Sequence, residues 1–578
     1  MCGIAGIVGA GASAEIARDM ALRLQHRGPD GEGVWADVGV ALSHRRLAIQ
    51  DLTEAGHQPM VFGSHVLTYN GELYNHERLR AALPGPWASS GDTEVVLRLL
   101  ATEGSACLQR LVGMFAFASW DTGSKTLLLV RDRLGIKPLY YRLMPDGIAF
   151  ASELKALVPL GACEVDAGAV RDFLFHGYIP APKTIYRGIC KLPAAHTLTW
   201  RAGSVRLERY WNPSTAITER SAEDTVAQLD SLLGEVIPQH TVSDVPVGVF
   251  LSGGIDSALT AYYLDAPRTY TLGFEAGGRS EAEAARQVAA HLDTAHLEMT
   301  APQADFAGAL DRMPAMFDEP FGDSAAWSNY LVAQFARREV TVALSGEGGD
   351  EIFCGYPRYW SRVGGRSNFL NRSLARYLPP LSRLAASMQR RGYVGLPAYA
   401  AAMGGMTAQQ IDSLLAPSWR APGYDYLWFY RQYWRDELSP LSQLRWLDLN
   451  TDLAEGLLTK VDRTSMVHSL EVRPPLLDHR LVEFMLTVDP HLLVDEQRKR
   501  GKLLVRRLME PRLPANHLNR PKSGFGLPVH RWLKEHPQLL RDAMRRLMDR
   551  GIVQQTVASD FRRAWSLLVL DRWFTAFG

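Results

Sequence analysis

The chain has 578 residues, a length that predicts two or more domains. Its formal net charge is +1 with both signs interspersed, so nothing in the composition points to nucleic acid or an anionic membrane as a partner. No apolar run approaches the length of a membrane-spanning helix, and the first residues lack the basic segment of a signal peptide. The five scattered cysteines, without Cys-x-x-Cys spacing, favour a reducing compartment and no structural zinc.

The first candidate functional residue is Cys2. A small second residue permits removal of Met1, and Cys2 would then combine its thiol with a free α-amino group of pKa ~8. Such an amine can activate the neighbouring nucleophile. The alternative is a small apolar residue at the start of a strand predicted over residues 4–8, and Cys2 taken alone favours that alternative.

Short polar motifs follow Cys2 along the chain. Residues 27–30 (Arg-Gly-Pro-Asp) predict a tight turn, and residues 44–49 (His-Arg-Arg-Leu-Ala-Ile) predict a strand that carries a cation. Residues 69–75 predict a strand that ends in a polar turn, and residues 90–94 predict a helix start with Asp92 as the N-cap. Many short strands with few long helices predict stacked antiparallel sheets.

Together with Cys2, these motifs resemble a class II glutamine amidotransferase domain of the N-terminal-nucleophile type, an αββα sandwich. The resemblance implies that Cys2 attacks the side-chain amide of glutamine. It also implies an oxyanion hole made by the side-chain amide of Asn70 and the backbone N–H of Gly71. The glutamine-binding residues that it implies are Arg46 for the α-carboxylate, and Glu72 and Asp92 for the α-ammonium group. The alternative for these three is solvated surface charge.

The chain then changes character. Residues 198–222 carry no clean period and are predicted to connect two domains, one over residues 1–207 and one over residues 222–578. Predicted strands at 245–250, 268–274, 295–299 and 340–344 alternate with predicted helices at 258–264, 281–292 and 325–337. This alternation predicts a doubly wound parallel α/β sheet, in which ligands bind at the carboxyl ends of the strands.

Two glycine-rich motifs follow strands of this predicted sheet. Residues 251–257 (Leu-Ser-Gly-Gly-Ile-Asp-Ser) join a strand to a helix, an arrangement in which backbone N–H groups converge on an anion. Asp256 would repel a bare phosphate, which implies a divalent cation between them. The motif lacks the lysine of a Walker A loop, which argues against γ-phosphoryl transfer. Residues 345–351 (Ser-Gly-Glu-Gly-Gly-Asp-Glu) add carboxylates whose repulsion Mg²⁺ would relieve. The alternatives are an ordinary Gly-Gly turn and a flexible acidic turn.

The first motif resembles the pyrophosphate loop of enzymes that cleave ATP between the α and β phosphates, and the pair resembles the asparagine synthetases. The resemblance implies that Asp256 and Asp350 bind Mg²⁺, that Glu347 acts near the ammonia as base or charge stabiliser, and that Lys502 steadies the acyl-adenylate and pyrophosphate. A basic loop at residues 520–526, with Lys522, is a weaker match. The residues implied to contact ATP are Leu251, Ser252, Gly253, Gly254, Asp256, Ser257, Ser345 and Gly346.

The resemblance therefore implies a glutamine-hydrolysing asparagine synthetase that uses ATP and Mg²⁺. Cys2 would form a glutamyl thioester and release ammonia, and the ammonia would attack an acyl-AMP at a second site. Aspartate is the default acceptor, and the alternative is a related amidotransferase for a secondary metabolite or a uronic acid sugar. A non-catalytic binding protein of the same fold is a further alternative, against which Cys2, Asp256, Glu347 and Asp350 argue. The resemblance also implies a cytoplasmic homodimer with small-molecule substrates.

Overall fold

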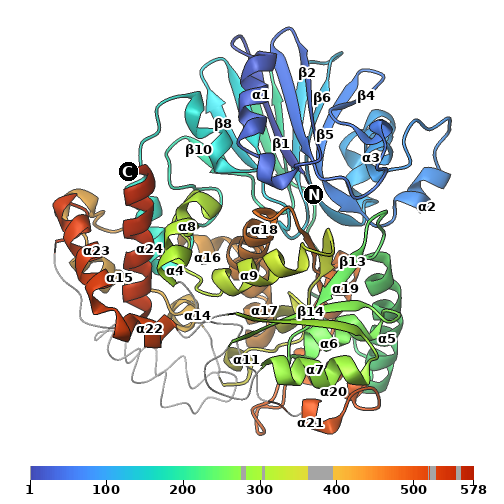
Figure 1. The fold of residues 1–578 in the computed structure, drawn as a ribbon, viewed down its shortest axis with the longest axis vertical. Coiled ribbons are helices and arrows are strands. Elements are labelled where there is room, and N and C mark those ends of the chain that lie inside the picture. Colours follow the sequence, from blue (N-terminus) through green and yellow to red (C-terminus); the bar gives the residue numbers. More distant parts are fainter. Residues whose placement is uncertain are drawn as a thin grey trace.

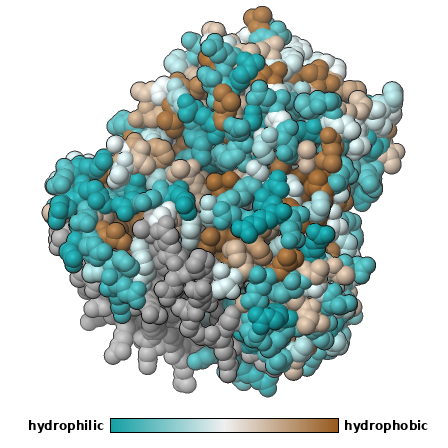
Figure 2. Space-filling view, in the orientation of Figure 1, coloured by the Kyte–Doolittle hydropathy of each residue, from teal (hydrophilic) through white to brown (hydrophobic). Residues whose placement is uncertain are grey.

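The computed structural model describes residues 2–274, 281–301, 306–361, 395–518, 520, 529–554 and 561–578. Met1 and Lys522 lie outside these ranges. Figure 1 shows two lobes: the N-terminal lobe (up to residue 209), in blue and teal at the top, and the C-terminal lobe (from residue 222) below it. None of the helices in the described ranges is both long and apolar enough to cross a membrane. Figure 2 shows a mostly hydrophilic face on which hydrophobic residues are scattered among polar ones.

The N-terminal lobe contains two antiparallel sheets with strand orders β10-β8-β9-β1-β3-β2 and β12-β11-β7-β6-β5-β4. The strands are β1 (Gly3–Gly9), β2 (Gly31–Asp37), β3 (Val40–Arg46), β4 (Met60–Phe62), β5 (His65–Leu73), β6 (Gly113–Asp121), β7 (Thr126–Arg131), β8 (Tyr140–Met144), β9 (Gly147–Ala151), β10 (Ile189–Lys191), β11 (His196–Arg201) and β12 (Ser204–Arg209).

Alternation along the central strands explains how these sheets stack. On β1, Ile4 and Val8 point into the core between the two sheets, whereas Ala5 and Ile7 point to the opposite face and pack against α1 (Ala14–Leu22). Helix α3 (Asp92–Glu103) covers the outer face of the second sheet. The layers are therefore helix, sheet, sheet and helix, which confirms the predicted sandwich. The lobe also contains α2 (His76–Ala81). Helix α4 (Ala167–His176) precedes β10 in the chain but lies beside the helices of the C-terminal lobe (Figure 1), where Arg171 Nη1 lies 3.0 Å from Asp412 Oδ1.

The C-terminal lobe contains a parallel sheet of order β15-β14-β13-β16-β17. Its strands are β13 (Val247–Phe250), β14 (Arg268–Phe274), β15 (Ala295–Ala301), β16 (Val342–Leu344) and β17 (Glu471–Arg473). Helices α6 (Ile255–Tyr262) and α7 (Glu281–His291) lie on one face, and α9 (Ala326–Ala336) and α18 (Leu458–Met466) on the other (Figure 1). The predicted doubly wound parallel sheet is confirmed. β13 begins after the predicted start at residue 245, because Pro246 has no N–H to donate to a neighbouring strand.

The C-terminal lobe contains further helices. They are α5 (Ala222–Gln239), α8 (Phe306–Phe317), α10 (Gly349–Ile352), α11 (Pro357–Ser361), α14 (Leu396–Met403), α15 (Ala408–Leu414), α16 (Trp428–Gln432), α17 (Pro440–Asn450), α19 (His479–Leu486), α20 (Leu503–Met509), α21 (Ala515–Leu518), α22 (Val529–Glu535), α23 (Pro537–Asp549) and α24 (Phe561–Phe577). Helix α24 packs on the body of the lobe, where Trp565 Nε1 donates to Gly322 O at 2.9 Å and Trp573 Nε1 to Asp318 O at 2.8 Å.

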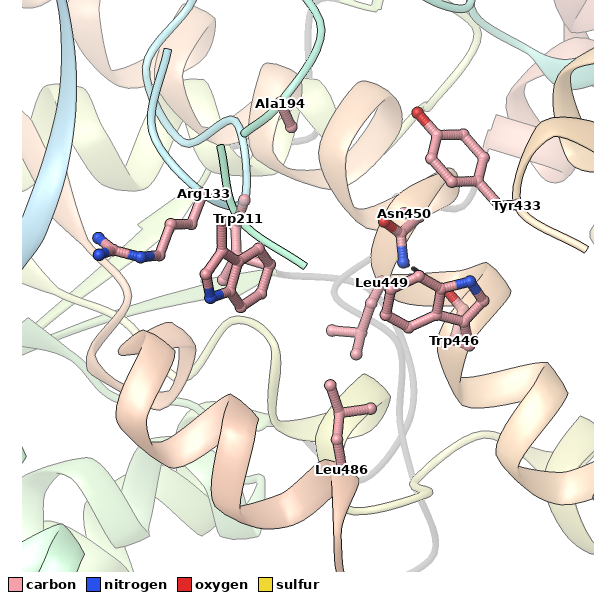
Figure 3. Close-up of a pocket in the computed structure, with 9 residues that line it drawn as sticks. Arg133, Ala194, Trp211, Tyr433, Trp446, Leu449, Asn450 and Leu486 are labelled. Atoms are coloured by element: carbon pink, nitrogen blue, oxygen red, sulfur yellow. Dashed lines mark hydrogen bonds between the residues drawn. The ribbon is translucent and has the colours of Figure 1, made fainter. Parts of the chain in front are cut away.

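One edge of the interface between the lobes closes around a small cavity (Figure 3). Its volume is about 10 Å³, room for no more than a single water molecule. Figure 3 shows Trp211 and Trp446 on either side of Leu449. The guanidinium of Arg435 stacks 3.8 Å from the centre of the Trp446 ring, and Trp211 Nε1 donates to Glu483 Oε1 at 2.7 Å. The lobes are therefore closely packed here.

Buried ion pairs join the lobes nearer their centre. The side chain of Arg27 has no exposed surface, and its Nη1 lies 2.8 Å from both Glu153 Oε1 and Asp462 Oδ2. Arg463 Nη1, from the C-terminal lobe, lies 2.8 Å from Glu153 Oε2. Burial raises the pKa of Glu153, but Arg463, His26 and Lys155 outweigh it, so the pKa lies well below its usual value. Removing one partner of such a cluster leaves a buried charge unbalanced.

We therefore expect Asp462→Asn to lower the free energy of unfolding by about 3 kcal/mol, because Arg27 keeps its charge and loses its partner in the C-terminal lobe. Denaturant titration followed by tryptophan fluorescence measures this change. The matched control is Asp425→Asn, whose partner Arg431 is exposed, with an expected change below ~1 kcal/mol. Equal shifts in the two variants would contradict the role assigned to the buried pair.

Candidate active sites

The first site forms around Cys2, at the start of β1. Cys2 is buried, with 8% of its surface exposed, and its backbone N donates to Asn70 Oδ1 at 2.9 Å. After removal of Met1 that nitrogen would be the α-amino group beside the thiol. Burial raises the pKa of the Cys2 thiol, whereas the charge of the chain's amino terminus and the hydrogen bond with Leu47 lower it. The side chain is therefore placed beside the nitrogen that could take its proton.

Donors for an oxyanion lie next to this cysteine. Asn70 Nδ2 is buried and has no hydrogen-bond partner among the described residues, although a buried amide normally has one. Gly71 follows on the same strand, and a Cβ atom there would lie 2.5 Å from Met114 O. Only glycine therefore fits at position 71. Asn70 combines an occupied acceptor, which anchors it to Cys2, with an unused donor.

The three residues predicted to bind glutamine are buried in the same lobe, which excludes the alternative of solvated surface charge. Arg46 is 7% exposed, and its guanidinium donates to Thr53 O at 2.9 Å and to Asp51 O. Both partners are carbonyl oxygens, and among the described residues no carboxylate forms an ion pair with Arg46. Glu72 and Asp92 are 2% and 5% exposed. Burial raises the pKa of Glu72 well above its usual value; Arg473 opposes this effect and Asp92 adds to it. An ammonium group would relieve this pair of acids.

The prediction that Asp92 is the N-cap of its helix is wrong. Gly91, with extended backbone angles of −74° and 170°, is the N-cap of α3, and Asp92 is its first residue. The Asp92 carboxylate instead accepts a hydrogen bond from the backbone N of Leu73 at 2.8 Å. This bond directs the side chain toward the strand that carries Asn70 and Glu72.

The second site is a cavity of about 710 Å³ at the carboxyl ends of β13 and β16. Helix α6 begins at Ile255, earlier than the predicted start at residue 258, so Asp256 and Ser257 belong to its first turn. The Ser257 hydroxyl lies 2.9 Å from the Ser252 hydroxyl and accepts from Ser252 N at 3.0 Å. The predicted residues that line this cavity are Leu251, Ser252, Gly253, Gly254, Asp256, Ser257, Ser345, Gly346, Glu347, Asp350 and Lys502.

The two glycine motifs touch each other within this cavity. A Cβ atom at Gly346 would lie 2.7 Å from Ser257 N, and one at Gly349 would lie 2.6 Å from Asp256 Cγ. The glycines are therefore required for the two loops to meet. Ser345 Oγ is buried without a partner among the described residues, which leaves a hydroxyl for a ligand in the cavity.

Lys502 lies between the two predicted metal ligands. Its Nζ contacts Asp256 Oδ2 and lies 2.6 Å from Asp350 Oδ1. Burial lowers the pKa of Lys502, but the two carboxylates outweigh it and raise the pKa overall. The described residues contain no group of three or more His, Cys, Asp or Glu side chains able to hold a metal ion by themselves. Two carboxylates fit Mg²⁺ nevertheless, because this ion is commonly held by one or two carboxylates together with substrate phosphates.

Glu347 lies in the same cavity with a raised pKa. Burial is the largest cause; Lys460 opposes it, and Asp350, Asp323 and Asp256 add to it. A raised pKa makes the Glu347 carboxylate a stronger base, which suits a residue predicted to accept a proton. Sequence analysis assigns no role to Lys460 or Asp323. The structure places Lys460 Nζ 2.8 Å from Asp323 Oδ2, with Lys460 buried at the cavity wall.

Comparison with known proteins agrees with this two-lobed architecture. A family model described as glutamine amidotransferase domain matches residues 1–211, and one described as asparagine synthase matches residues 228–575. The chain therefore combines an amidotransferase domain with a second, synthase-type domain. It belongs to the asparagine synthase family.

Relatives match along almost their whole length. The chain is 32% identical to glutamine-hydrolyzing asparagine synthetase 3 of Bacillus subtilis, over 94% of this chain and 91% of that protein. It is 28% identical to glutamine-hydrolyzing asparagine synthetase 1 of the same organism, over 99% and 96%. It is also 27% identical to the amidase chyE of Penicillium rubens, over 88% and 85%.

Proposed function

We propose that this protein is a glutamine-hydrolysing asparagine synthetase, which converts aspartate, glutamine and ATP into asparagine, glutamate, AMP and pyrophosphate. The observation that carries the proposal is that one chain brings together two separate clusters of predicted site residues: Cys2 with Asn70, and Lys502 between Asp256 and Asp350. Family membership and the names of the full-length relatives support the same activity.

At the first site, Cys2 Sγ attacks the side-chain amide carbon of glutamine, and the α-amino group of Cys2 takes the thiol proton and passes it to the leaving ammonia. Asn70 Nδ2 and the N–H of Gly71 stabilise the oxyanion. Water then hydrolyses the thioester and releases glutamate. Arg46 binds the α-carboxylate of glutamine. The α-ammonium group of glutamine lies against Glu72 and Asp92.

At the second site, the β-carboxylate of aspartate attacks the α-phosphorus of ATP and pyrophosphate leaves. Lys502 stabilises the negative charge that develops on the phosphates. Ammonia then attacks the acyl-AMP, Glu347 takes the excess proton, and AMP leaves. Mg²⁺, held by Asp256 and Asp350, would supply further positive charge on the pyrophosphate.

A product assay tests this function. Purified protein is given Mg-ATP, glutamine and aspartate, and pyrophosphate and asparagine are measured together. We expect one pyrophosphate for each asparagine. If glutamine is hydrolysed but no pyrophosphate is released with aspartate, aspartate is not the acceptor. Other carboxylic acids are then screened as acceptors in the same assay. In that second candidate, Lys460 at the cavity wall would face a different carboxylate.

Asn70→Ala tests the oxyanion hole. Removal of one preorganised donor is expected to lower kcat for glutamine hydrolysis by about 10²-fold, with ammonia-dependent synthesis unchanged. Glutamate release and asparagine formation from ammonium chloride measure the two activities. The control is Asn450→Ala, at the edge of the lobe interface, where glutamine hydrolysis should stay within about twofold. An undiminished kcat in Asn70→Ala would remove Asn70 from the oxyanion hole.

A further inference from the structure

Strand β17 (Glu471–Arg473) lies at the edge of the parallel sheet and has one side toward each site. Val472 lines the ATP cavity. Glu471 and Arg473 point the other way, as alternate residues of a strand must, and Arg473 reaches the N-terminal lobe. Both charged side chains have no exposed surface. A strand of the C-terminal lobe therefore contributes charge to the first site.

The side chain of Arg473 positions Glu72, one of the residues predicted to bind glutamine. Its Nη2 donates to Glu72 Oε2 at 2.9 Å, and its Nε donates to Glu471 Oε1 at 2.5 Å. Its Nη1 donates to the carbonyl oxygens of His240 at 2.8 Å and Val242 at 2.7 Å. The planar guanidinium is thus fixed on three sides, and it fixes the Glu72 carboxylate in turn.

The backbone of Arg473 forms a hydrogen bond with a residue of the second site, the ATP cavity. Its carbonyl oxygen accepts a hydrogen bond from Ser345 N at 2.9 Å, and it pairs in register with Leu344 at the end of β16. Ser345 is the first residue of the second glycine motif and lines the ATP cavity. Arg473 therefore contacts a predicted glutamine-binding residue, Glu72, through its side chain, and the predicted ATP-binding loop at Ser345 through its main chain.

Glu471 adds a charge to the same location. It raises the pKa of the Cys2 thiol, after the larger effects of burial, the amino-terminal charge and Leu47, so it lies within electrostatic reach of the nucleophile. Burial raises the pKa of Glu471, but the amino-terminal charge, Arg473 and Lys137 outweigh it and lower the pKa to about 2. Glu471 is therefore ionised and balances Arg473.

We propose that Arg473 is a positioning residue that couples the two sites. When glutamine brings its ammonium group to Glu72, that carboxylate divides its charge between the substrate and Arg473. A shift of the guanidinium moves β17, and β17 carries Ser345 by a direct backbone hydrogen bond. Coupling of this kind is reciprocal, so ATP must change the affinity for glutamine by the same factor as glutamine changes the affinity for ATP. The inference rests on the glutamine-binding role of Glu72 in the proposed function.

The test compares Arg473→Met with the wild-type protein. Glutamate release gives the KM for glutamine with and without Mg-ATP, and pyrophosphate release with ammonium chloride reports the second site alone. We expect the KM for glutamine to rise about tenfold in Arg473→Met, because Glu72 loses a charged partner. The effect of ATP on that KM, present in the wild-type protein, should disappear, while ammonia-dependent release stays within about twofold. Arg473→Lys should restore part of the coupling.

Arg131→Met is the matched control. Arg131 is also a buried interdomain arginine: its Nη1 lies 3.4 Å from Glu455 Oε1, its other partners are the carbonyl oxygens of Gly135, Lys137 and Leu192, and it does not line the ATP cavity. The Arg131→Met variant should be less stable than the wild-type protein, and ATP should still change its KM for glutamine. The inference is overturned if ATP has no effect on the wild-type KM, if Arg473→Met keeps the effect, or if its ammonia-dependent activity falls in parallel. A wild-type protein that shows the ATP effect but forms no asparagine leaves the coupling standing and refutes the proposed acceptor.

Discussion

Replacement of Cys2 by alanine is expected to abolish glutamine-dependent synthesis and to leave ammonia-dependent synthesis intact. Cys2 is the nucleophile of the proposed mechanism, and loss of a nucleophile removes the whole covalent route. We expect glutamate release to fall by about 10⁴-fold or more. The ATP cavity lies in the other lobe and contains no atom of Cys2 among its lining residues, so its chemistry should continue when ammonium chloride supplies the nitrogen.

Cys107→Ala is the control for this experiment. Cys107 is a fully buried cysteine of the same lobe that belongs to the apolar cluster around α3 and is none of the residues predicted for the first site. This variant should retain both activities and show a lower thermal midpoint. Parallel loss of glutamine-dependent and ammonia-dependent synthesis in folded Cys2→Ala would mean that the two sites are not chemically separate, and the two-step mechanism would have to be abandoned.

The residues of each site could be predicted from the sequence where they are close together in the chain. Residues 251–257 and 345–351 follow β13 and β16, which are neighbours in the parallel sheet, so both motifs lie at the carboxyl edge where ligands bind in this fold class. Glycine at positions 346 and 349 is explained by the contact between the two loops, because any side chain there would meet Ser257 or Asp256. The predicted sandwich of the N-terminal lobe likewise follows from short alternating strands.

Pairings between distant residues could not be predicted in this way. Arg473 meets Glu72 across 401 positions of the chain, and Arg27 meets Asp462 across 435 positions. Nothing local in the sequence distinguishes a buried arginine with a carboxylate partner in another lobe from one on the surface. Such pairs depend on how the two lobes dock, which the apolar pattern of single strands and helices does not specify. The role of β17 therefore becomes visible only in the folded chain.

The N-cap of α3 shows a second limit, on a smaller scale. Asp is a favourable N-cap, and propensity alone selected Asp92 over Gly91. The Asp92 carboxylate accepts its hydrogen bond from the backbone N of Leu73, at the end of β5, and not from the first turn of α3. A tertiary hydrogen bond thus overrides a local preference, and it does so at a residue predicted to bind glutamine.

Asp350→Asn is expected to remove ATP turnover and spare glutamine hydrolysis. Asp350 and Asp256 share Lys502 Nζ, so the two carboxylates are near enough to share a cation as well. The amide keeps the shape of the side chain and loses its charge, which weakens the hold on Mg²⁺ and on Lys502 together. We expect ammonia-dependent pyrophosphate release to fall by about 10³-fold, an effect of several kcal/mol on the transition state.

The metal role can be separated from the role of the lysine. If Asp350 holds Mg²⁺, raising the Mg²⁺ concentration should recover part of the pyrophosphate release in Asp350→Asn, and a chelator should abolish release in the wild-type protein while glutamate release continues. Asp230→Asn, which disrupts a salt bridge to Arg512 outside the cavity, should leave both activities unchanged. Pyrophosphate release that is undiminished in Asp350→Asn would remove this carboxylate from the metal site. Diminished release that no Mg²⁺ concentration restores would instead assign Asp350 to the positioning of Lys502.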